Sequence, residues 1–526
     1  MKRFLAGEDI REAQRLGQKE IRVPAGTVVT DLALEMARDA SIAITETSGA
    51  KASAESDDLR AGLGAALDRH GGIGPGKDLS ADGIFDLLLT GASVVVPELG
   101  MLSANVAVKG GRIAALTTEQ PPARRTVDLS GKFLLPGIVD PHIHLGLFAS
   151  IDEELRTETR SALIGGVTSV GCFFNQPASY RTLLAELDRK IPELSHVDLL
   201  PHLTLREPLH LQELGEYRRS GVRSFKMYMC GIPGILPHQE DGFILRGMRE
   251  IASVAPDALL CIHAENSSIV ADRTDELLGG GAAVTLRSWG ETHPEISEEE
   301  AVMRAVLFAT RTGVRLYLVH IGTKSAIETL SQIKRQNVFV ETTSPYLSSY
   351  DDQNSVNLKM VPPIRDRATV DLLWSALERG VVDTIGTDNT TLTSREKGSG
   401  MKEAVPGYPA LGTHVPSILN ESLKRGIPLE KIVPAMTLNP ARILGLYPRK
   451  GTILPGSDAD LVVVDMGREK RVDAKELGGR SDFALHGNEV LRGWPIMTVK
   501  NGNIVAEDGQ LTGYGAAASR GRLLRA

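Results

Sequence analysis

The sequence has few cysteines, few aromatic residues and no long apolar run. Only three cysteines occur in 526 residues, too few for a disulfide framework. We therefore expect Cys172, Cys230 and Cys261 to be small core residues of a reduced, cytoplasmic protein. No apolar stretch approaches the roughly 20 residues of a membrane span. The charged segment Met1–Ile10 lacks the apolar core of a signal peptide. We expect no membrane association.

The sequence also has no excess of positive charge. Its formal net charge is -7 at pH 7, whereas nucleic-acid binding needs a basic surface. A hydrophobic share of 42% and a charged share of 24% are those of an ordinary globular protein. The length predicts two or three structural units. We therefore expect several domains and no nucleic-acid partner.

The first 80 or so residues differ in texture from the rest. Glu20–Val28 is strand-like, and Asp31–Asp39 has the apolar spacing of a helix. The run Ser48–Ser80 is rich in alanine, serine, glycine and charge, which suits a linker more than a core. We predict that residues 1–80 are an accessory extension and linker, with a small docking module as the simplest role.

From Phe85 onward, β-rich segments flank a long region in which short apolar runs alternate with amphipathic ones. The flanking β-rich segments are Phe85–Val96, Val106–Leu116, Asp460–Asp465, Pro495–Lys500 and Asn503–Ala506. The apolar runs between them are Thr168–Phe174, Val197–Leu203, Ser224–Met229, Leu259–His263, Leu316–His320, Val338–Thr342 and Thr384–Asp388. Helical stretches such as Glu298–Arg311 and Ala368–Arg379 lie between these runs.

This alternation predicts an α/β fold. Strands alternating with helices favour a parallel sheet, and about eight such units favour a closed (β/α)₈ TIM barrel. We place the barrel at residues 136–450. The segments before and after it, residues 85–135 and 451–515, are predicted to join into a small composite β-sandwich domain beside the barrel.

Polar residues end several of the predicted barrel strands, the face where such barrels place their active sites. In Asp140-Pro-His-Ile-His144 the two histidines lie two residues apart, so both imidazoles point the same way. His263, His320 and Asp388 each end an apolar run, where an unpartnered polar group is costly to bury. One such histidine is usually a core residue. Four histidines with an aspartate indicate metal binding.

Lys226 lies inside another apolar run, Val222–Met229. A lysine there is costly unless it is neutralised or paired. Alone, it fits a Schiff-base lysine or an ion-pair partner. Beside two metal ions, carbamylation by carbon dioxide would make it an anionic bridge between them.

These motifs resemble those of the cyclic amidohydrolases in the amidohydrolase superfamily. The nearest branch is that of dihydropyrimidinases and hydantoinases, with allantoinases and dihydroorotases as relatives. The resemblance runs from about Phe85 to Gly513. It rests on Pro136-Gly-Ile-Val-Asp-Pro-His-Ile-His144, Gly165-Gly-Val-Thr168, Ser224-Phe-Lys226, His263-Ala-Glu-Asn266, Pro362-Pro-Ile-Arg365, Gly386-Thr-Asp388, Asn439-Pro-Ala-Arg442 and Gly456-Ser-Asp-Ala-Asp460.

The resemblance implies a centre of two divalent metal ions. Its ligands would be His142, His144 and Asp388 at the more buried ion, His263 and His320 at the second ion, and carbamylated Lys226 as the bridge. We expect Zn²⁺ because histidine and oxygen ligands suit it, although Mn²⁺, Co²⁺ or Ni²⁺ would also serve. The relatives are commonly tetramers, so we expect a homo-oligomer, either a tetramer or a dimer.

The implied reaction opens a cyclic amide, imide or ureide ring with a metal-bridging hydroxide. Two divalent ions carry about +4, of which the carbamate, Asp388 and the hydroxide remove about three charges. The remainder favours the oxyanion of a tetrahedral intermediate, and metal binding lowers the pKa of water toward about 7. Asp388 would orient the hydroxide, take its proton and return it to the leaving nitrogen.

The substrate-binding positions differ from those of relatives. His144-Leu-Gly-Leu-Phe148 lacks the arginine with which dihydroorotases hold a substrate carboxylate. Asn175 lies where dihydroorotases have a substrate-binding asparagine, and Thr343 is a second candidate for a substrate contact. We expect Leu199 to replace the oxyanion tyrosine of hydantoinases and Pro406 to replace their ring-contacting asparagine.

Three alternatives stay open. The chain would be an allantoinase, or a hydrolase of an unusual lactam or imide, if its pocket has been rebuilt. It would be a mononuclear enzyme if Lys226 is unmodified. A non-catalytic scaffold, like the dihydropyrimidinase-related proteins, would lack metal ligands, and all six are present here. His202 fits either a core histidine or a pocket residue.

Overall fold

The structure is a computed structural model that describes residues 83–232, 236–279, 283–513 and 520–525, with short stretches of residues 4–47. In the N-terminal stretches, β2 (Glu20–Pro24) pairs in parallel with β4 (Ala43–Thr47), and β1 (Phe4–Leu5) with β3 (Val28–Val29). The predicted strand at Glu20 is therefore present. Most of the predicted helix, residues 31–39, and the whole predicted linker, residues 48–80, lie outside the described residues.

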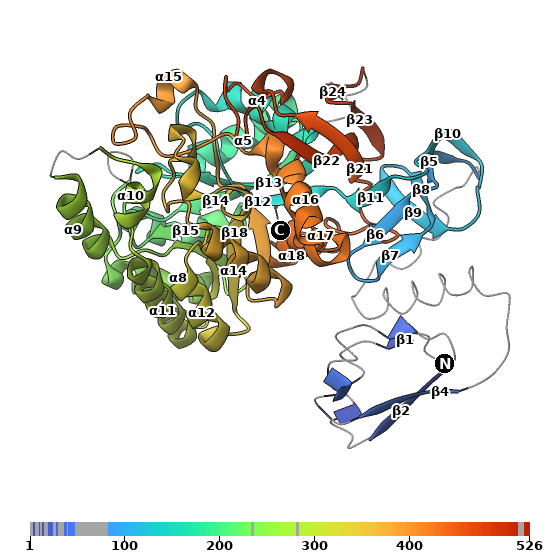
Figure 1. The fold of residues 1–526 in the computed structure, drawn as a ribbon, viewed down its shortest axis with the longest axis horizontal. Helices are drawn as coiled ribbons and strands as arrows, with labels where there is room; N and C mark the ends of the chain where they lie inside the picture. Colours follow the sequence, from blue (N-terminus) through green and yellow to red (C-terminus); the bar gives the residue numbers. More distant parts are fainter. Residues whose placement is uncertain are drawn as a thin grey trace.

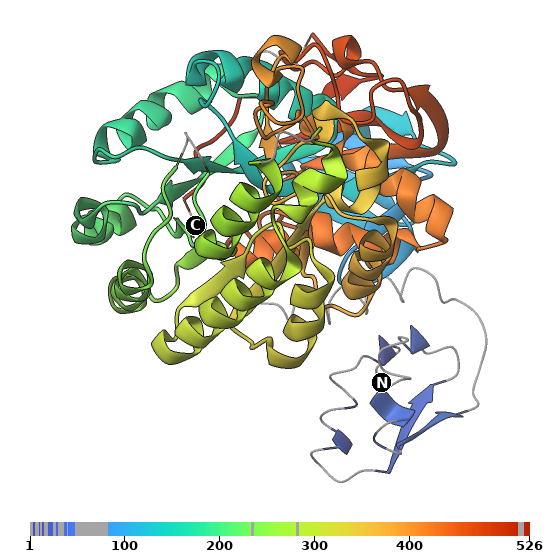
Figure 2. The same ribbon diagram turned by 60° about the vertical axis from the view of Figure 1, so that its left-hand side comes forward.

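A parallel sheet of nine strands forms the centre of the molecule, and helices surround it (Figures 1 and 2). In chain order the strands are β12 (Ile138–His144), β13 (Val167–Phe174), β14 (Asp198–Thr204), β15 (Ser224–Tyr228), β16 (Leu259–His263), β17 (Arg315–Leu318), β18 (Val338–Thr343), β19 (Thr384–Gly386) and β20 (Asn389–Thr390). Each strand from β12 to β19 pairs with the next, and β20 pairs back onto β12. The sheet is therefore curled, and each predicted apolar run overlaps one of its strands.

Helices connect these strands or follow the last of them. They are α4 (Ile151–Ile164), α5 (Arg181–Leu194), α6 (Pro208–Gln212), α7 (Leu214–Arg219), α8 (Asp241–Val254), α9 (Ser267–Leu278), α10 (Leu286–Glu291), α11 (Glu295–Thr312), α12 (Lys324–Ile333), α13 (Ser344–Ser348), α14 (Arg367–Glu378), α15 (Ser394–Lys397), α16 (His414–Arg425), α17 (Leu429–Met436) and α18 (Leu438–Ile443). Local sequence sets their ends: Ser150 caps the first turn of α4, and Gly313 ends α11 with φ 78°. In the described parts of the chain, none of the helices has the length and hydropathy that a membrane crossing requires.

Side chains of the barrel strands alternate between two cores. In β14, Leu199 belongs to the large core between the sheet and its helices, whereas Leu200 belongs to a smaller core. The smaller core also contains Val139, Phe173 and Leu259 from neighbouring strands, so it fills the inside of the curled sheet. This alternation decides which residues of each strand can reach a site inside the sheet.

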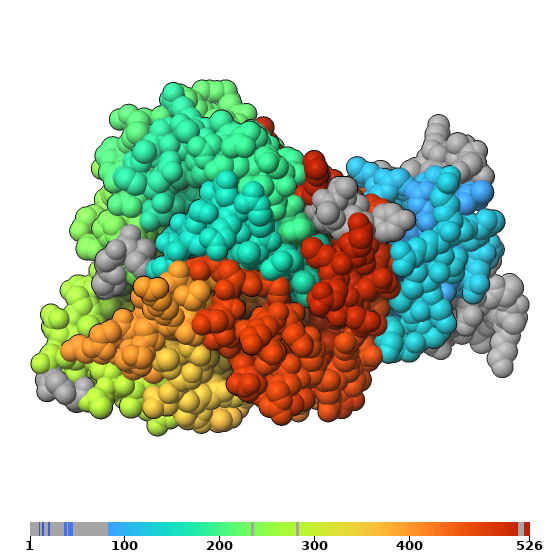
Figure 3. Space-filling view, turned by 90° about the horizontal axis from the view of Figure 1, so that it is seen from above, coloured from blue at the N-terminus to red at the C-terminus, as the bar shows by residue number. Residues whose placement is uncertain are grey.

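Two further sheets lie beside the central sheet: the first is built only from residues before it, and the second combines segments from before and after it. One has the order β10-β5-β8-β9 and the other the order β24-β23-β22-β21-β11-β6-β7. Their strands are β5 (Phe85–Thr90), β6 (Ser93–Val96), β7 (Gly100–Ser103), β8 (Asn105–Lys109), β9 (Arg112–Thr117), β10 (Ala123–Asp128), β11 (Phe133–Pro136), β21 (Leu461–Arg471), β22 (Val490–Lys500), β23 (Asn503–Glu507) and β24 (Gln510–Leu511). The antiparallel pairing of β11 with β21 joins the two segments. In Figure 3 the light-blue residues of β5–β10 lie next to the red C-terminal part of the chain.

A buried ion cluster ties the C-terminal residues 520–525 to the central sheet. Asp198, at the start of β14, accepts hydrogen bonds from Lys450 at 2.7 Å, Lys500 at 2.8 Å and Arg522 at 2.8 Å. Burial opposes ionisation of Asp198, but the three cations hold the pKa of its carboxyl well below the usual range. Beside it, Leu524 packs inside the curled sheet. The charges of this cluster are thus compensated within the chain.

We expect Asp198→Asn to lower the stability of the protein by about 3–5 kcal/mol, because it leaves buried cations without their carboxylate. The measurement is the urea midpoint of unfolding. Asp188→Asn is the matched control, since Asp188 pairs with Arg525 of the same tail at the exposed surface. Such a pair contributes about 0–1 kcal/mol. Equal midpoints for the two variants would contradict the role of the buried cluster.

Candidate active site

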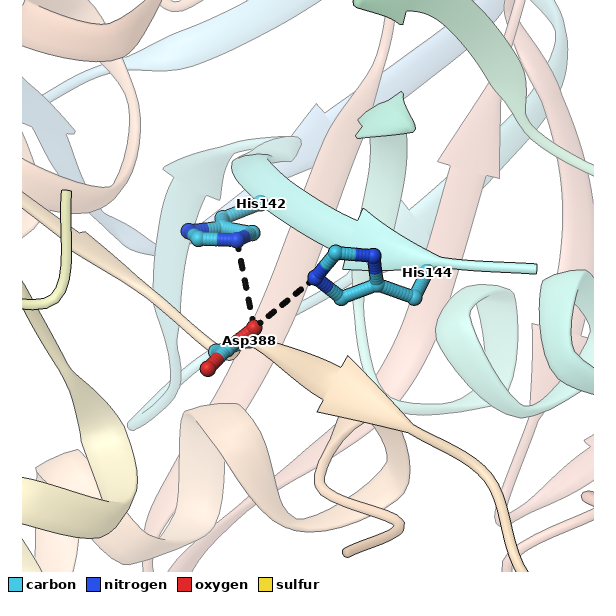
Figure 4. Close-up of side chains that lie close together, drawn as sticks. All are labelled: His142, His144 and Asp388. Carbon is cyan, nitrogen blue, oxygen red and sulfur yellow. Dashed lines mark hydrogen bonds and ion pairs between the residues drawn. The ribbon is translucent and has the colours of Figure 1, made fainter. Parts of the chain in front are cut away.

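The central sheet brings the polar residues predicted from the sequence to one end. His142 and His144 lie in β12, and Asp388 lies between β19 and β20, next to them in the sheet. The Nε2 atoms of His142 and His144 are each 3.1 Å from Oδ1 of Asp388 (Figure 4). The ligand atoms lie within 4.8 Å of one another, so the three residues form a group that can hold a metal ion.

A second pair of histidines lies at the same end of the sheet. His263 is the last residue of β16, and His320 follows β17 by two residues. Nδ1 of His263 is 3.1 Å from Nε2 of His320. Burial is the main reason why the pKa of His263 is lowered and that of His320 is held well below its usual value. Neutral imidazoles whose nitrogen atoms face each other are suited to binding a metal ion.

Lys226 lies close to both groups of histidines. Its side chain is completely buried, and its Nζ has no hydrogen-bond partner among the described residues. Burial lowers the pKa of Lys226 to about 8. Burial is also the main cause of the lowered pKa values of His144, His263 and His320, and the charge of Lys226 lowers each of them further. A buried amine without a partner is costly, so the site fits a further group at this nitrogen.

Two of these residues have strained backbone. Asp388 has φ 53° and His320 has φ 43°, in the left-handed region that non-glycine residues rarely adopt. Such strain persists where the surroundings over-determine it, often at functional sites. Gly386 permits the close packing beside them, because a Cβ there would lie 2.0 Å from Oε1 of Glu341 and 3.1 Å from Cβ of His142.

Two buried glutamates that the sequence analysis missed contact the histidines. Oε2 of Glu341 lies 3.0 Å from Nδ1 of His142, and Oε2 of Glu265 lies 2.8 Å from Nε2 of His263. Burial alone would lower the pKa of His142, but the charges of Glu341 and Asp388 raise it to about 9. The sequence did contain a signal for both glutamates: each lies in or beside a buried strand, and a charged residue in such a position needs a partner.

A cavity adjoins these residues. Besides the histidines, Lys226 and Asp388, it is lined by Asn175 and Tyr228 and by a mostly apolar set of side chains. The apolar set includes Leu147, Phe148, Ile232, Leu236, Met360 and Pro406. Pro406 therefore lies at the cavity, where the sequence analysis expected it. Among the described residues that line the cavity, Lys226 is the only cationic residue apart from the histidines.

The two predicted substrate contacts lie in different surroundings. Asn175 faces the cavity, and its Oδ1 accepts a hydrogen bond from Nη1 of Arg206 at 3.4 Å. Thr343 does not line the cavity. Its hydroxyl accepts a hydrogen bond from the backbone N–H of Tyr346 at 3.4 Å and so caps α13. A substrate contact by Thr343 stays a prediction.

The sequence analysis expected Leu199 at the position of the oxyanion tyrosine, and this prediction is wrong. Leu199 points out of the curled sheet into the large core and does not line the cavity. A tyrosine does line it: Tyr228, two residues after Lys226, packs on the ring of His263 with centroids 5.6 Å apart. The period of two in a strand was the available signal, since it places residues 226 and 228 on one side.

His202 has the surroundings of a core histidine. Its Nδ1 lies 2.5 Å from Oγ of Ser224 and its Nε2 lies 3.1 Å from the carbonyl oxygen of Pro141. Its ring stacks on Phe173, with centroids 4.2 Å apart. Both ring nitrogens therefore have partners, and His202 is not among the residues that line the cavity.

Two other groups of described residues have metal-ligand spacing. Asp198, Asp458 and Asp460 form one, but Lys450 and Arg522 already pair with its carboxylates. Cys230, His263 and Glu265 form the other. Burial raises the pKa of Cys230 to about 12, which disfavours the thiolate that binds metal. The histidine, lysine and aspartate cluster has the most suitable donor set.

Comparison with known proteins agrees with this geometry. Residues 133–505 match the family described as "Amidohydrolase family". The chain is 30% identical to an L-hydantoinase of Paenarthrobacter aurescens over 464 residues, covering 83% of this chain and 98% of that protein. It is 33% identical to an allantoinase of Deinococcus radiodurans over 461 residues, covering 84% and 98%. The solved structure of an L-hydantoinase (dihydropyrimidinase) from Arthrobacter aurescens matches with a TM-score of 0.78 and 27% identity, covering 84% of this chain and all of that one.

Proposed function

Because the chain belongs to the amidohydrolase family and is a hydrolase acting on cyclic amides, we propose that it opens a dihydropyrimidine- or hydantoin-like ring at a centre of two divalent metal ions. The observation that carries this proposal is the place of Lys226. Its buried, unpartnered amine lies near both histidine groups. Carbamylation would give that nitrogen two oxygen ligands and a negative charge, which is what two adjacent cations require.

The proposed ligands divide between the two ions. His142, His144 and Asp388 would hold the first ion, and His263 and His320 the second, with carbamylated Lys226 shared. Zn²⁺ is the ion we propose, because imidazole and carboxylate ligands suit it. When bound, the two ions would supply a hydroxide nucleophile at neutral pH and polarise the scissile carbonyl.

The residues of the chain would then handle the proton and the developing charge. Burial opposes ionisation of Asp388, but the charge of His142 holds the pKa of that carboxyl well below its usual range. An ionised Asp388 can accept the proton of the nucleophile and deliver it to the leaving nitrogen. Tyr228 lines the cavity beside His263, and burial raises the pKa of its hydroxyl. It would therefore stay protonated and donate a hydrogen bond to the oxyanion.

The cavity favours a substrate with an apolar substituent. Leu147, Phe148 and Met360 offer it no charge, and among the described lining residues no arginine is present to hold a carboxylate. Arg206 occupies Oδ1 of Asn175, which leaves the amide N–H groups of Asn175 for a substrate carbonyl. We propose that the substrate presents a carbonyl oxygen at Asn175 and an apolar group toward the mouth of the cavity.

Ring opening by the metal-loaded full chain tests this function. The panel is dihydrouracil, hydantoin, allantoin, dihydroorotate, succinimide and a simple lactam, with 5-benzylhydantoin and 5-carboxymethylhydantoin as a matched pair. We expect kcat/KM for the benzyl compound to exceed that for the carboxymethyl compound by at least about 10-fold, because a buried carboxylate without a cation is disfavoured.

The other outcomes assign the alternatives. Turnover confined to allantoin would make the chain an allantoinase, and turnover of succinimide or the lactam alone would give it another cyclic substrate. Preference for the carboxymethyl compound would refute the apolar pocket. The absence of ring opening throughout, with both metals bound, would support the non-catalytic scaffold.

The finer architecture is part of the same proposal. β19 and β20 are two pieces of one segment, and β20 pairs with β12, so we propose a closed (β/α)₈ barrel. The two other sheets share an apolar core that includes Leu89, Val106 and Val463, which supports a composite β-sandwich over residues 85–135 and 451–515. We further propose a homo-oligomer, tetramer or dimer, in the cytoplasm, where the three buried free cysteines would stay reduced. The role of residues 1–80 as an accessory extension stays a prediction.

A further inference from the structure

The side chain of His263 is held between two groups that contact different ring nitrogens. Nδ1 faces Nε2 of His320 at 3.1 Å, while Nε2 lies 2.8 Å from Oε2 of Glu265. Glu265 is completely buried. A carboxylate can only accept a hydrogen bond, so Nε2 of His263 carries the proton and Nδ1 keeps a free lone pair.

The other glutamate selects the opposite nitrogen in His142. Oε2 of Glu341 lies 3.0 Å from Nδ1 of His142, and Nε2 of His142 faces Asp388 at 3.1 Å. Glu341 therefore holds a proton on Nδ1, and Nε2, on the side of Asp388, is the nitrogen that would give up its proton to bind a metal ion. The two histidines therefore present different nitrogen atoms to the cavity, and in each case a buried carboxylate makes the choice.

Glu265 is itself fixed from the other side. Its Oε1 lies 2.8 Å from Nδ1 of His293, and the carbonyl oxygen of His293 accepts a hydrogen bond from Nη2 of Arg365 at 2.7 Å. Both carboxylate oxygens of Glu265 therefore have partners. A carboxylate held in this way fixes both the tautomer and the ring plane of His263.

We propose that Glu265 is the positioning residue of the second metal ion. It holds His263 in the tautomer whose Nδ1 can bind that ion, and it has no contact of this kind with the first group, His142, His144 and Asp388. This inference rests on the proposed binuclear centre. It predicts that the second metal site can be weakened through Glu265 while the first keeps its affinity. Glu341 would not separate the sites in this way, because its Oε2 contacts both Nδ1 of His142 and the backbone N–H of His320.

The test measures metal binding and does not depend on turnover. Apo-protein is titrated with Co²⁺ against a competing chelator, and the visible absorption of bound Co²⁺ reports each site. We expect the unmodified chain to bind two ions. In Glu265→Ala the affinity for one ion should fall by about 10- to 100-fold while the other stays near its original value. In Glu265→Gln the loss should be below about 10-fold, because the amide oxygen still accepts from Nε2 of His263.

Glu298→Gln is the matched control. Glu298 is another buried glutamate, but it accepts hydrogen bonds from Thr323 and the backbone of Gly322 and contacts none of the proposed ligands. We expect this variant to keep both affinities. Two sites of unchanged affinity in both Glu265 variants would overturn the inference and leave the proposed function intact. An unmodified chain that binds fewer than two Co²⁺ ions would overturn both. If Glu265→Ala does not fold, Glu265→Gln decides. A weaker affinity for one ion than in Glu298→Gln supports the positioning role, and affinities equal to those of Glu298→Gln contradict it.

Discussion

Replacing Lys226 with alanine is expected to remove at least one metal ion and nearly all ring-opening activity. The proposed bridge supplies two oxygen ligands from one side chain, and alanine supplies none. Loss of a contact that only supports a ligand lowers metal affinity or activity by 10- to 100-fold. Loss of the bridge itself should exceed about 10²-fold in kcat/KM. Metal analysis of the purified variant and initial rates on the best substrate of the panel measure both effects.

Chemical rescue distinguishes a bridging role from a structural one. The space left by the lysine side chain lies next to the rings of Phe173 and Tyr228, each 4.8 Å from the original Nζ. A short-chain carboxylic acid such as propionate should enter it, restore the oxygen bridge and recover part of the activity and of the metal content. Full activity of Lys226→Ala with two metal ions bound would refute the bridging role.

Lys397→Ala is the matched control for this experiment. Lys397 is also a fully buried lysine, and burial lowers its pKa to about 7. Its Nζ, however, donates hydrogen bonds to the carbonyl oxygens of Lys359 at 2.8 Å and Gly407 at 2.6 Å, so it joins two loops. We expect Lys397→Ala to lose stability, to keep both metal ions and to show no recovery with propionate.

The residues that meet in the site could be predicted from the sequence because the ends of apolar runs indicate the ends of strands. His263 ends a run whose bounds, Leu259–His263, are the same in the structure. The period of two explained how His142 and His144 share one side of a strand. The structure brings together all six predicted metal-binding residues, although their role as ligands stays a proposal. What the sequence could not supply is the pairing of residues that are distant along the chain, such as His142 with Glu341.

Two departures from the predicted strands have local causes. The predicted run Thr384–Asp388 is split in the structure, because Asp388 adopts φ 53° and interrupts the extended backbone between β19 and β20. The predicted run Phe85–Val96 is broken by Gly91, whose φ of 75° turns the chain between β5 and β6. A left-handed glycine can be anticipated from sequence, whereas a left-handed aspartate is imposed by the packing around it.

The prediction for Leu199 failed because the resemblance does not show which side of the strand each residue faces. Leu200 and His202 share one side of β14, and Leu199 lies on the other. Parity would also have identified Tyr228, which follows Lys226 by two residues. A resemblance can therefore place a strand correctly and still assign a role to a side chain that faces the large outer core and not the inside of the sheet.

Asp388→Asn is expected to lower turnover much more than metal content. The amide keeps one oxygen at the position that Oδ1 occupies, 3.1 Å from the Nε2 atoms of His142 and His144. It cannot accept a proton at neutral pH. General acid–base catalysis contributes about 10²- to 10⁴-fold, so kcat should fall by that amount while metal analysis still finds close to two ions. A variant that loses its metals in proportion to its activity would show that Asp388 acts as a ligand alone.

Asp140→Asn tests whether any buried carboxylate at this end of the sheet has the same effect. Asp140 lies two residues before His142, and it accepts hydrogen bonds from the backbone N–H groups of His142 and Thr387, both at 3.1 Å. Burial is the main cause that raises the pKa of Asp140 to about 7, so close to neutral pH a large fraction of it is already uncharged. Replacement by asparagine therefore changes the charge at position 140 less than it changes the charge at position 388. The proposed proton transfer requires the ionised form of Asp388. If both asparagine variants lose turnover equally, the loss reflects disturbed packing around the histidines. If only Asp388→Asn does, the proton acceptor of the reaction is Asp388.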